Sequence, residues 1–176
     1  MPDELRLFLK ERFGVQGPLS PGRFEAELAK RLGSPARRAP LLKAWRAYLA
    51  QGGREAVRSF YREVLKVPKG EALVYGMHLP HLEFYAKELP PRVEGRVLEV
   101  GAFTGALVGF LQRKRPDLEW HALDGVEEAV ALGKKRVPGV AWRLGWAEEV
   151  ELAPFDALLL LSVFPEGLVD QGLESR

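Results

Sequence analysis

The sequence contains no cysteine, no asparagine and no isoleucine, and Thr104 is its only threonine. Without cysteine there can be no disulfide framework and no cysteine-ligated metal, and we expect no metal site. No apolar run approaches the length that spans a bilayer, and the opening stretch MPDELRLFLKERF is charged throughout, unlike a signal peptide. We therefore expect a cytoplasmic protein with no membrane partner.

The 176 residues, 47% of them apolar, suffice for one domain with a buried core, or for a core with a helical appendage. The lack of thermolabile asparagine and cysteine, together with abundant arginine, glutamate and proline, is typical of proteins from thermophiles. Composition alone thus indicates a globular, thermostable chain.

Charge is unevenly distributed. Residues 1–95 carry 17 Lys and Arg against 11 Asp and Glu, and residues 96–176 carry 9 against 13. A basic half is one signature of nucleic-acid binding. However, Arg54, Arg58 and Arg62 recur among acids at helical spacing, and the aromatic and basic pattern of the known RNA modules is missing. This favours a solvated helix face, and nucleic acid is not the partner we expect.

Residues 1–90 show helical periodicity. The expected helices are 2–13, 21–32, 36–50, 54–65 and 71–89, the last with an interruption at Pro80. Ser20-Pro21 is typical of a helix start, and Gly33 of a helix end. Pro90-Pro91 and Gly95 then separate these helices from the rest of the chain. We expect a helical N-terminal region over 1–92 and a second unit over 93–176.

From Arg96 onward, strands alternate with helices, which is typical of an α/β fold with a parallel sheet. The expected strands are 96–100, 118–123, 140–144 and 155–161, with helices over 104–115 and 126–136. The last strand contains Ala157-Leu158-Leu159-Leu160-Leu161, which is apolar on both faces. Such a run suits a strand covered on both sides.

The stretch RVLEVGAFTGALVGFL, from Arg96 to Leu111, predicts a strand, a tight glycine turn and the start of a helix. Gly101 permits the sharp turn, and Gly105 permits close packing of the helix. A dinucleotide-binding loop needs a further glycine where the backbone approaches the pyrophosphate. Phe103 occupies that place, which argues against NAD and FAD.

The same residues closely resemble motif I of the class I S-adenosylmethionine (SAM)-dependent methyltransferases, an acidic residue followed by a glycine-rich loop. Glu99, Gly101 and Gly105 match this motif, and Phe103-Thr104-Gly105 looks like a variant found in some O-methyltransferases of the class. The resemblance, which covers about residues 85–167, implies SAM as cofactor. It implies a Rossmann-like parallel sheet of about four strands in the order 3-2-1-4, preceded by the all-helical N-terminal region.

The resemblance also implies a set of cofactor-binding residues. Asp124 stands at the end of the second strand, where an acid can accept hydrogen bonds from ribose hydroxyls; it could instead cap helix 126–136. Trp146 replaces a family acid beside the adenine and could stack on the base or simply be buried. The complete expected set is Glu99, Gly101, Ala102, Phe103, Thr104, Gly105, Asp124, Gly125, Val126, Trp146, Ala147 and Ser162.

Catalytic residues are harder to assign. Methyl transfer is a direct displacement in which the cofactor supplies the reactivity and the protein the orientation, so a general base is optional. Candidates are His78, His81, Tyr75 and Tyr85, before the first strand, and Ser162, at the end of the fourth. His78 and His81 can share a helix face, but no third metal ligand is evident. None is assigned as an acid or base.

The family core has seven strands, and residues 162–176 are too few for three more. The resemblance therefore implies a C-terminally shortened relative whose fourth strand has a free apolar edge. We expect a homodimer through that edge, or cover by the N-terminal helices. Two functions stay open: a methyltransferase acting on a small-molecule acceptor, or a non-catalytic methyltransferase-like module that binds SAM or a partner chain.

Overall fold

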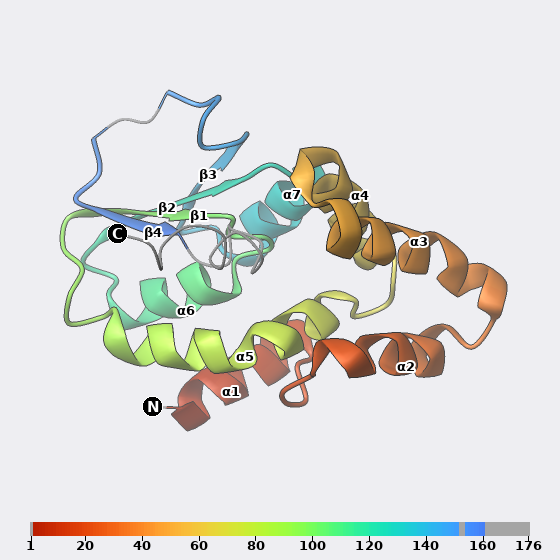
Figure 1. The fold of residues 1–176 in the computed structure, drawn as a ribbon. Coiled ribbons are helices and arrows are strands. Elements are labelled where there is room, and N and C mark those ends of the chain that lie inside the picture. The colour runs from red at the N-terminus through yellow and green to blue at the C-terminus, as the bar shows by residue number, and fades with distance from the viewer. Residues whose placement is uncertain (1, 152–153, 161–176) are drawn as a thin grey trace, which may run out of the picture.

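Five helices precede an α/β unit in the computed structural model, which describes residues 2–151 and 154–160 (Figure 1). The helices of the first part are α1 (Pro2–Phe13), α2 (Pro21–Leu32), α3 (Pro35–Gln51), α4 (Gly53–Leu65) and α5 (Glu71–Glu88). The second part contains β1 (Arg96–Val100), α6 (Ala106–Lys114), β2 (Glu119–Asp124), α7 (Glu127–Arg136), β3 (Ala141–Leu144) and β4 (Ala157–Leu160). No helix among these residues combines the length and the apolar content that crossing a bilayer requires.

The four strands form one parallel sheet in the order β3-β2-β1-β4, which confirms the expected order. Leu98 of β1 lies opposite His121 of β2 on one side and Leu158 of β4 on the other. Because successive strands run in the same direction, each connection must cross over the sheet; α6 connects β1 to β2, and α7 connects β2 to β3. The carboxyl ends of β1, β2 and β3 therefore share one edge of the sheet.

Helix α5 runs through Pro80 without a break, so the expected interruption was wrong. Proline at this position cannot donate a hydrogen bond to the carbonyl of Gly76. The backbone N–H of Leu19, in the loop after α1, donates to that carbonyl instead, at 2.8 Å. The loop can approach because Gly76 has no side chain; a Cβ there would lie 3.1 Å from the Gly17 carbonyl oxygen. A long-range contact thus compensates for a local defect.

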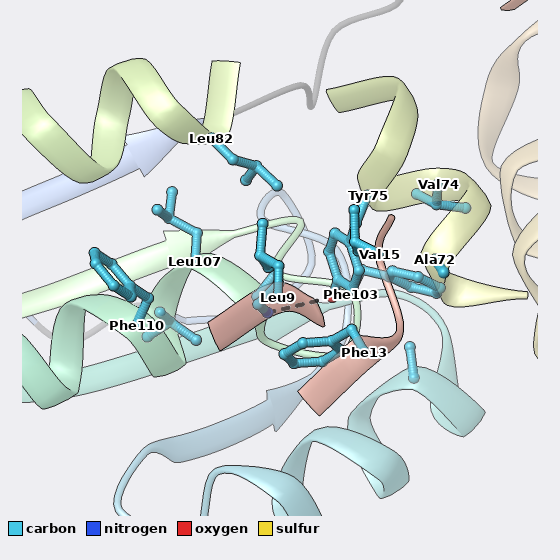
Figure 2. Packing of buried hydrophobic residues seen from close by; sticks show 14 of the residues in the cluster. Leu9, Phe13, Val15, Ala72, Val74, Tyr75, Leu82, Phe103, Leu107 and Phe110 are labelled. Carbon is cyan, nitrogen blue, oxygen red and sulfur yellow. Dashed lines mark hydrogen bonds between the residues drawn. The ribbon is translucent and has the colours of Figure 1, made fainter. Parts of the chain in front are cut away.

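One buried cluster joins the N-terminal helices to the sheet and includes residues from both sides of the expected boundary near residue 92. Figure 2 shows how α1 contributes: Leu9 and Phe13 lie among Tyr75 and Leu82 of α5 and Leu107 of α6. The first helix thereby packs against both α5 and α6. Burying these apolar side chains stabilises the pairing of the helical region with the sheet.

The other face of the sheet has a smaller apolar cluster, in which Leu98, Val100 and Leu123 pack beneath Phe155 and Val150. Strand β4 lies at the margin of the sheet, and Leu158 and Leu160 expose 52% and 48% of their surface. The expectation that this strand is covered on both faces is therefore wrong for these two residues, because its side chains alternate between a covered and an open face. Leu161 falls outside the described residues.

Candidate functional site

A pocket opens at the carboxyl ends of β1, β2 and β3. The strands and the loops after them contribute Gly101, Phe103, Asp124, Gly145 and Trp146 to its wall. Helices α3 and α4 supply the opposite wall, through Tyr48, Val57 and Tyr61. Ligands of open α/β sheets bind at this edge, outside the carboxyl ends of the strands. The pocket therefore lies where the glycine turn predicted a binding site.

The glycine loop adopts a backbone that requires glycine at its two ends. Gly101 and Gly105 have φ angles of +74° and +87°, and Phe103 between them has φ +50°. A Cβ on Gly105 would also meet the indole of Trp142 on β3, 2.7 Å from its Cζ2 atom. Gly105 therefore lets the loop bend and leaves room for Trp142 beneath it.

The backbone N–H groups of this loop already have partners inside the protein. Phe103 donates to Oδ2 of Asp124 at 2.7 Å. Thr104 and Ala106 donate to the hydroxyl of Tyr75 on α5, at 3.1 Å and 3.2 Å. A pyrophosphate at a glycine loop depends on free N–H groups of this kind. The loop thus offers little to a dinucleotide.

Tyr75 is a structural member of this network. Its hydroxyl oxygen accepts hydrogen bonds from two backbone N–H groups. The hydroxyl also lies 2.8 Å from Oγ1 of Thr104, to which it can donate a hydrogen bond. Burial raises the pKa of the Tyr75 phenol well above its usual range. With its hydroxyl engaged in three hydrogen bonds, Tyr75 holds the loop in place.

Glu99 lies beneath the loop, and its carboxylate accepts the N–H of Val108 at 2.9 Å. Val108 is in the first turn of α6, where N–H groups lack partners within the helix. Burial raises the pKa of Glu99 to about 8, opposed by the Val108 hydrogen bond and reinforced by the nearby Asp124. Glu99 acts as a cap for α6.

Asp124 holds two loops together and still lines the pocket. Its two carboxylate oxygens accept the N–H groups of Phe103 and Val126, at 2.7 Å and 2.8 Å. Burial raises the pKa of Asp124, and these two hydrogen bonds oppose the shift. Each carboxylate oxygen can accept a second hydrogen bond. The side chain can therefore bind a hydroxyl-bearing ligand without leaving its structural partners.

Two arginines of α4 contact the segments that follow β2 and β3 beside the pocket. Arg54 pairs with both Glu148 and Glu149. Arg58 donates to the carbonyl of Gly125 at 3.4 Å, and the guanidinium carbons of Arg54 and Arg58 lie 5.7 Å and 5.8 Å from the centre of the Trp146 ring. The indole covers Gly125, where a Cβ would lie 2.5 Å from its Cε2 atom. The helical region thus closes one side of the pocket.

The structure brings seven of the expected cofactor-binding residues to the pocket wall: Gly101, Phe103, Asp124, Gly125, Val126, Trp146 and Ala147. Four others shape the loop without lining the pocket: Glu99, Ala102, Thr104 and Gly105. His78, His81 and Tyr85 lie on α5 and are not part of the wall. Ser162 lies outside the described residues.

Sequence reasoning missed the helical wall, because Tyr48, Val57 and Tyr61 follow the same apolar period as core residues. Tyr61 is partly buried and packs against Phe103, with ring centroids 4.9 Å apart. The adjacent double glycine, Gly52-Gly53, places α4 against α3 but carries no sign of a ligand site. Within the described residues, no group of three or more His, Cys, Asp or Glu side chains could hold a metal ion.

Replacing Tyr75 by phenylalanine should lower the free energy of unfolding by about 2 kcal/mol, because the N–H groups of Thr104 and Ala106 then lose a buried acceptor. Urea unfolding at neutral pH measures the change. Tyr85→Phe, on the same helix and without a hydrogen bond from the phenol to any described residue, is the matched control and should change stability by less than about 0.5 kcal/mol. Equal effects of the two substitutions would contradict the assigned role of Tyr75.

Comparisons with known proteins do not assign an activity to the chain. No family model matches the chain, and no curated protein matches it. Solved structures that it resembles include the methyltransferase SibL in its apo form, described as SAM-dependent, at 21% identity and a TM-score of 0.46, over 80% of this chain and 45% of that one. Another is coclaurine N-methyltransferase bound to N-methylheliamine and SAH, at 15% identity and a TM-score of 0.39, over 89% and 52%.

A third is the plantazolicin methyltransferase BpumL, in complex with a desmethylPZN analogue and SAH, at 12% identity and a TM-score of 0.42, over 70% of this chain and 46% of that one. The chain spans about half the length of these proteins. Likenesses this distant carry no information about what this chain binds. The Rossmann-like layout rests on its own strand order.

Proposed function

We propose that the chain binds SAM in this pocket and transfers its methyl group to a small-molecule acceptor. The proposal rests on the hydrogen bonds of the glycine loop. The N–H groups of Phe103 and Thr104 are paired with Asp124 and Tyr75, while Asp124 still lines the pocket. A site of this kind suits a nucleoside without phosphates. SAM is such a nucleoside, and the residues fit it better than they fit NAD or FAD.

Each side of the pocket has its own role under this proposal. Asp124 accepts hydrogen bonds from the ribose hydroxyls through its unused lone pairs. Trp146 and Val126 provide apolar surface for the adenine. The turn at Gly101 leaves space for the methionine part. SAM supplies an electrophilic methyl group when bound, and the chain orients it and keeps water away.

A non-catalytic SAM-binding module is the second candidate function. Within the described residues, the candidate bases His78, His81 and Tyr85 do not line the pocket. Methyl transfer does not require a general base, so this placement is compatible with catalysis, but it also suits a protein that only binds the cofactor. Mass spectrometry of acceptor mixtures incubated with the protein and SAM separates turnover from binding.

Calorimetric titration with SAM tests the proposal. The wild type should bind SAM, and Asp124→Ala should weaken binding by roughly 1–3 kcal/mol, the cost of leaving ribose hydroxyls unpaired. Because Asp124 also holds Phe103 and Val126, the melting temperature of the ligand-free variant must be measured alongside. Val57→Trp places a large side chain in the pocket from α4, away from the hydrogen bonds of the loop, and should abolish binding. NAD is the negative control ligand; its binding in the same pocket, or no response to millimolar SAM, would refute the proposal.

A homodimer formed through β4 is also proposed, since Leu158 and Leu160 present an apolar surface at the sheet margin. Sedimentation velocity gives the mass. Leu160→Lys should shift a dimer toward monomer. The proposal is contradicted if the wild type is a monomer and Leu160→Lys leaves its free energy of unfolding unchanged.

A further inference from the structure

A second pocket lies at the opposite end of the sheet from the candidate site. It forms where the carboxyl-terminal ends of α1, α6 and α7 meet, and none of its residues lines the first pocket. Helices α6 and α7 run back toward the amino ends of the strands, which separates the two pockets. Its volume is about 190 Å³, several times the roughly 30 Å³ that one water occupies in the liquid. A hydrated ion of moderate size fits.

Three arginines line this pocket, and no carboxylate among the described residues does so. Arg12 comes from α1, Arg113 from α6 and Arg136 from α7. Arg136 pairs with the buried Glu71 of α5, whereas neither Arg12 nor Arg113 has an acidic partner in the described chain. The pocket thus carries two positive charges that nothing on the described chain neutralises.

Aromatic rings hold two of these arginines in place. The guanidinium carbon of Arg113 lies 5.3 Å from the ring centre of Phe8, and that of Arg136 lies 5.3 Å from the ring centre of Phe13. Both rings are almost fully buried in the core. A guanidinium stacked on a fixed ring loses less freedom on binding, and its planar N–H groups match the oxygens of phosphate.

Basic residues at helix ends have a simpler role, because cations near a helix C-terminus stabilise it. Lys134 and Lys135 in the last turn of α7 fit this role alone. It does not account for the convergence of side chains from three helices on one pocket, nor for the side-chain amide of Gln112 in the same wall. The two charges of Arg12 and Arg113, which lack acidic partners in the described chain, also exceed the partial negative charge of about half a unit at each helix end.

We propose that the pocket between Arg12, Arg113 and Arg136 binds a phosphate group of a small molecule. Phosphate matches the arginine fork with two parallel hydrogen bonds, and Gln112 adds a neutral donor. The pocket is partly open, and its volume, bounded by helix ends and the turn at Pro138-Gly139, suits a terminal phosphate group. The site is independent of the proposed SAM pocket.

Calorimetry with inorganic phosphate, in a buffer free of phosphate and sulfate and at low ionic strength, tests the proposal. We expect saturable binding that Arg12→Gln and Arg113→Gln each weaken roughly tenfold or more, since hydrogen bonds between charged groups are lost. Arg37→Gln removes the same charge from an exposed position on α3 and should leave the affinity unchanged. Melting temperatures without phosphate show whether each variant is folded.

A short single-stranded RNA forms the second arm. Binding of RNA without any response to inorganic phosphate would overturn the proposal, because the RNA would then be binding to surface charge outside the pocket. The proposal also fails if phosphate produces no saturable heat, or if Arg37→Gln weakens binding as much as the two pocket variants. Failure to bind SAM would leave this result unaffected.

Discussion

Gly105→Ala should lower the free energy of unfolding by about 2–5 kcal/mol, because a backbone cost and a packing cost add at this position. An L-residue at φ +87° loses about 1–2 kcal/mol. The new Cβ would also lie 2.7 Å and 2.9 Å from two ring atoms of Trp142, and overpacking of this kind costs about 1–3 kcal/mol.

Trp142 cannot easily give way. It is almost fully buried, and its indole N–H donates to the carbonyl of Val137 at 3.4 Å. On its other side a Cβ on Gly133 of α7 would lie 2.3 Å from the ring, so the indole lies between two glycines. Movement of the ring away from Gly105 is therefore restricted, and the strain passes to the loop.

Gly33→Ala is the matched control for Gly105→Ala. Gly33 also has a positive φ, +63°, although its ψ of −67° differs from the +32° of Gly105, and no atom lies within 4 Å of its hypothetical Cβ. Alanine there should cost only the backbone contribution, about 1 kcal/mol. Chemical unfolding of both variants measures the difference. If the two losses are equal, Trp142 does not limit the space at Gly105.

Glu99→Gln should stabilise the protein increasingly as the pH rises, by roughly 3–5 kcal/mol at pH 9 relative to pH 4. Burial raises the pKa of folded Glu99 to about 8, against 4.5 for the free side chain. Between these values the unfolded chain is ionised while the folded chain keeps its proton. The wild type therefore loses about 1.4 kcal/mol of stability per pH unit across this window.

Glutamine has no proton to lose and can still accept the N–H of Val108, so it removes the pH dependence and keeps the cap. The measurement is the free energy of unfolding of both proteins from pH 4 to pH 9. Glu11→Gln, at an exposed carboxylate of α1, is the control for the change in net charge. A constant difference between Glu99→Gln and the wild type would mean that Glu99 ionises normally in the folded chain.

Glu99 and Gly105 also show that a motif residue can be required for the shape of a loop. Both are expected to take part in binding the cofactor, and that expectation stays a prediction. In the structure the Glu99 carboxylate caps α6, and Gly105 leaves room for the Trp142 ring. Both residues thereby support the pocket from behind without lining its wall.

Much of the fold was predictable because its signals are local. The strand Arg96–Val100, the glycines at positions 101 and 105, and the acid at the end of the next strand are all indicated by residue spacing within short windows. Strand order was implied by the family resemblance and is confirmed. The interruption expected at Pro80 is absent from the helix. The N–H that bonds to the Gly76 carbonyl in place of the missing proline N–H comes from Leu19, far away in the sequence.

Local pattern therefore determined the chain's alternation of strands and helices, the glycine turn and the position of Asp124. Long-range packing decided the rest: that Tyr75 pairs with the loop, that Trp142 lies beneath Gly105, and that α4 closes the pocket through Arg54. The physical reason is that an apolar or basic period on a helix specifies which face is buried but not which partner it meets. The partner depends on how distant segments pack, and no short stretch of sequence contains that information.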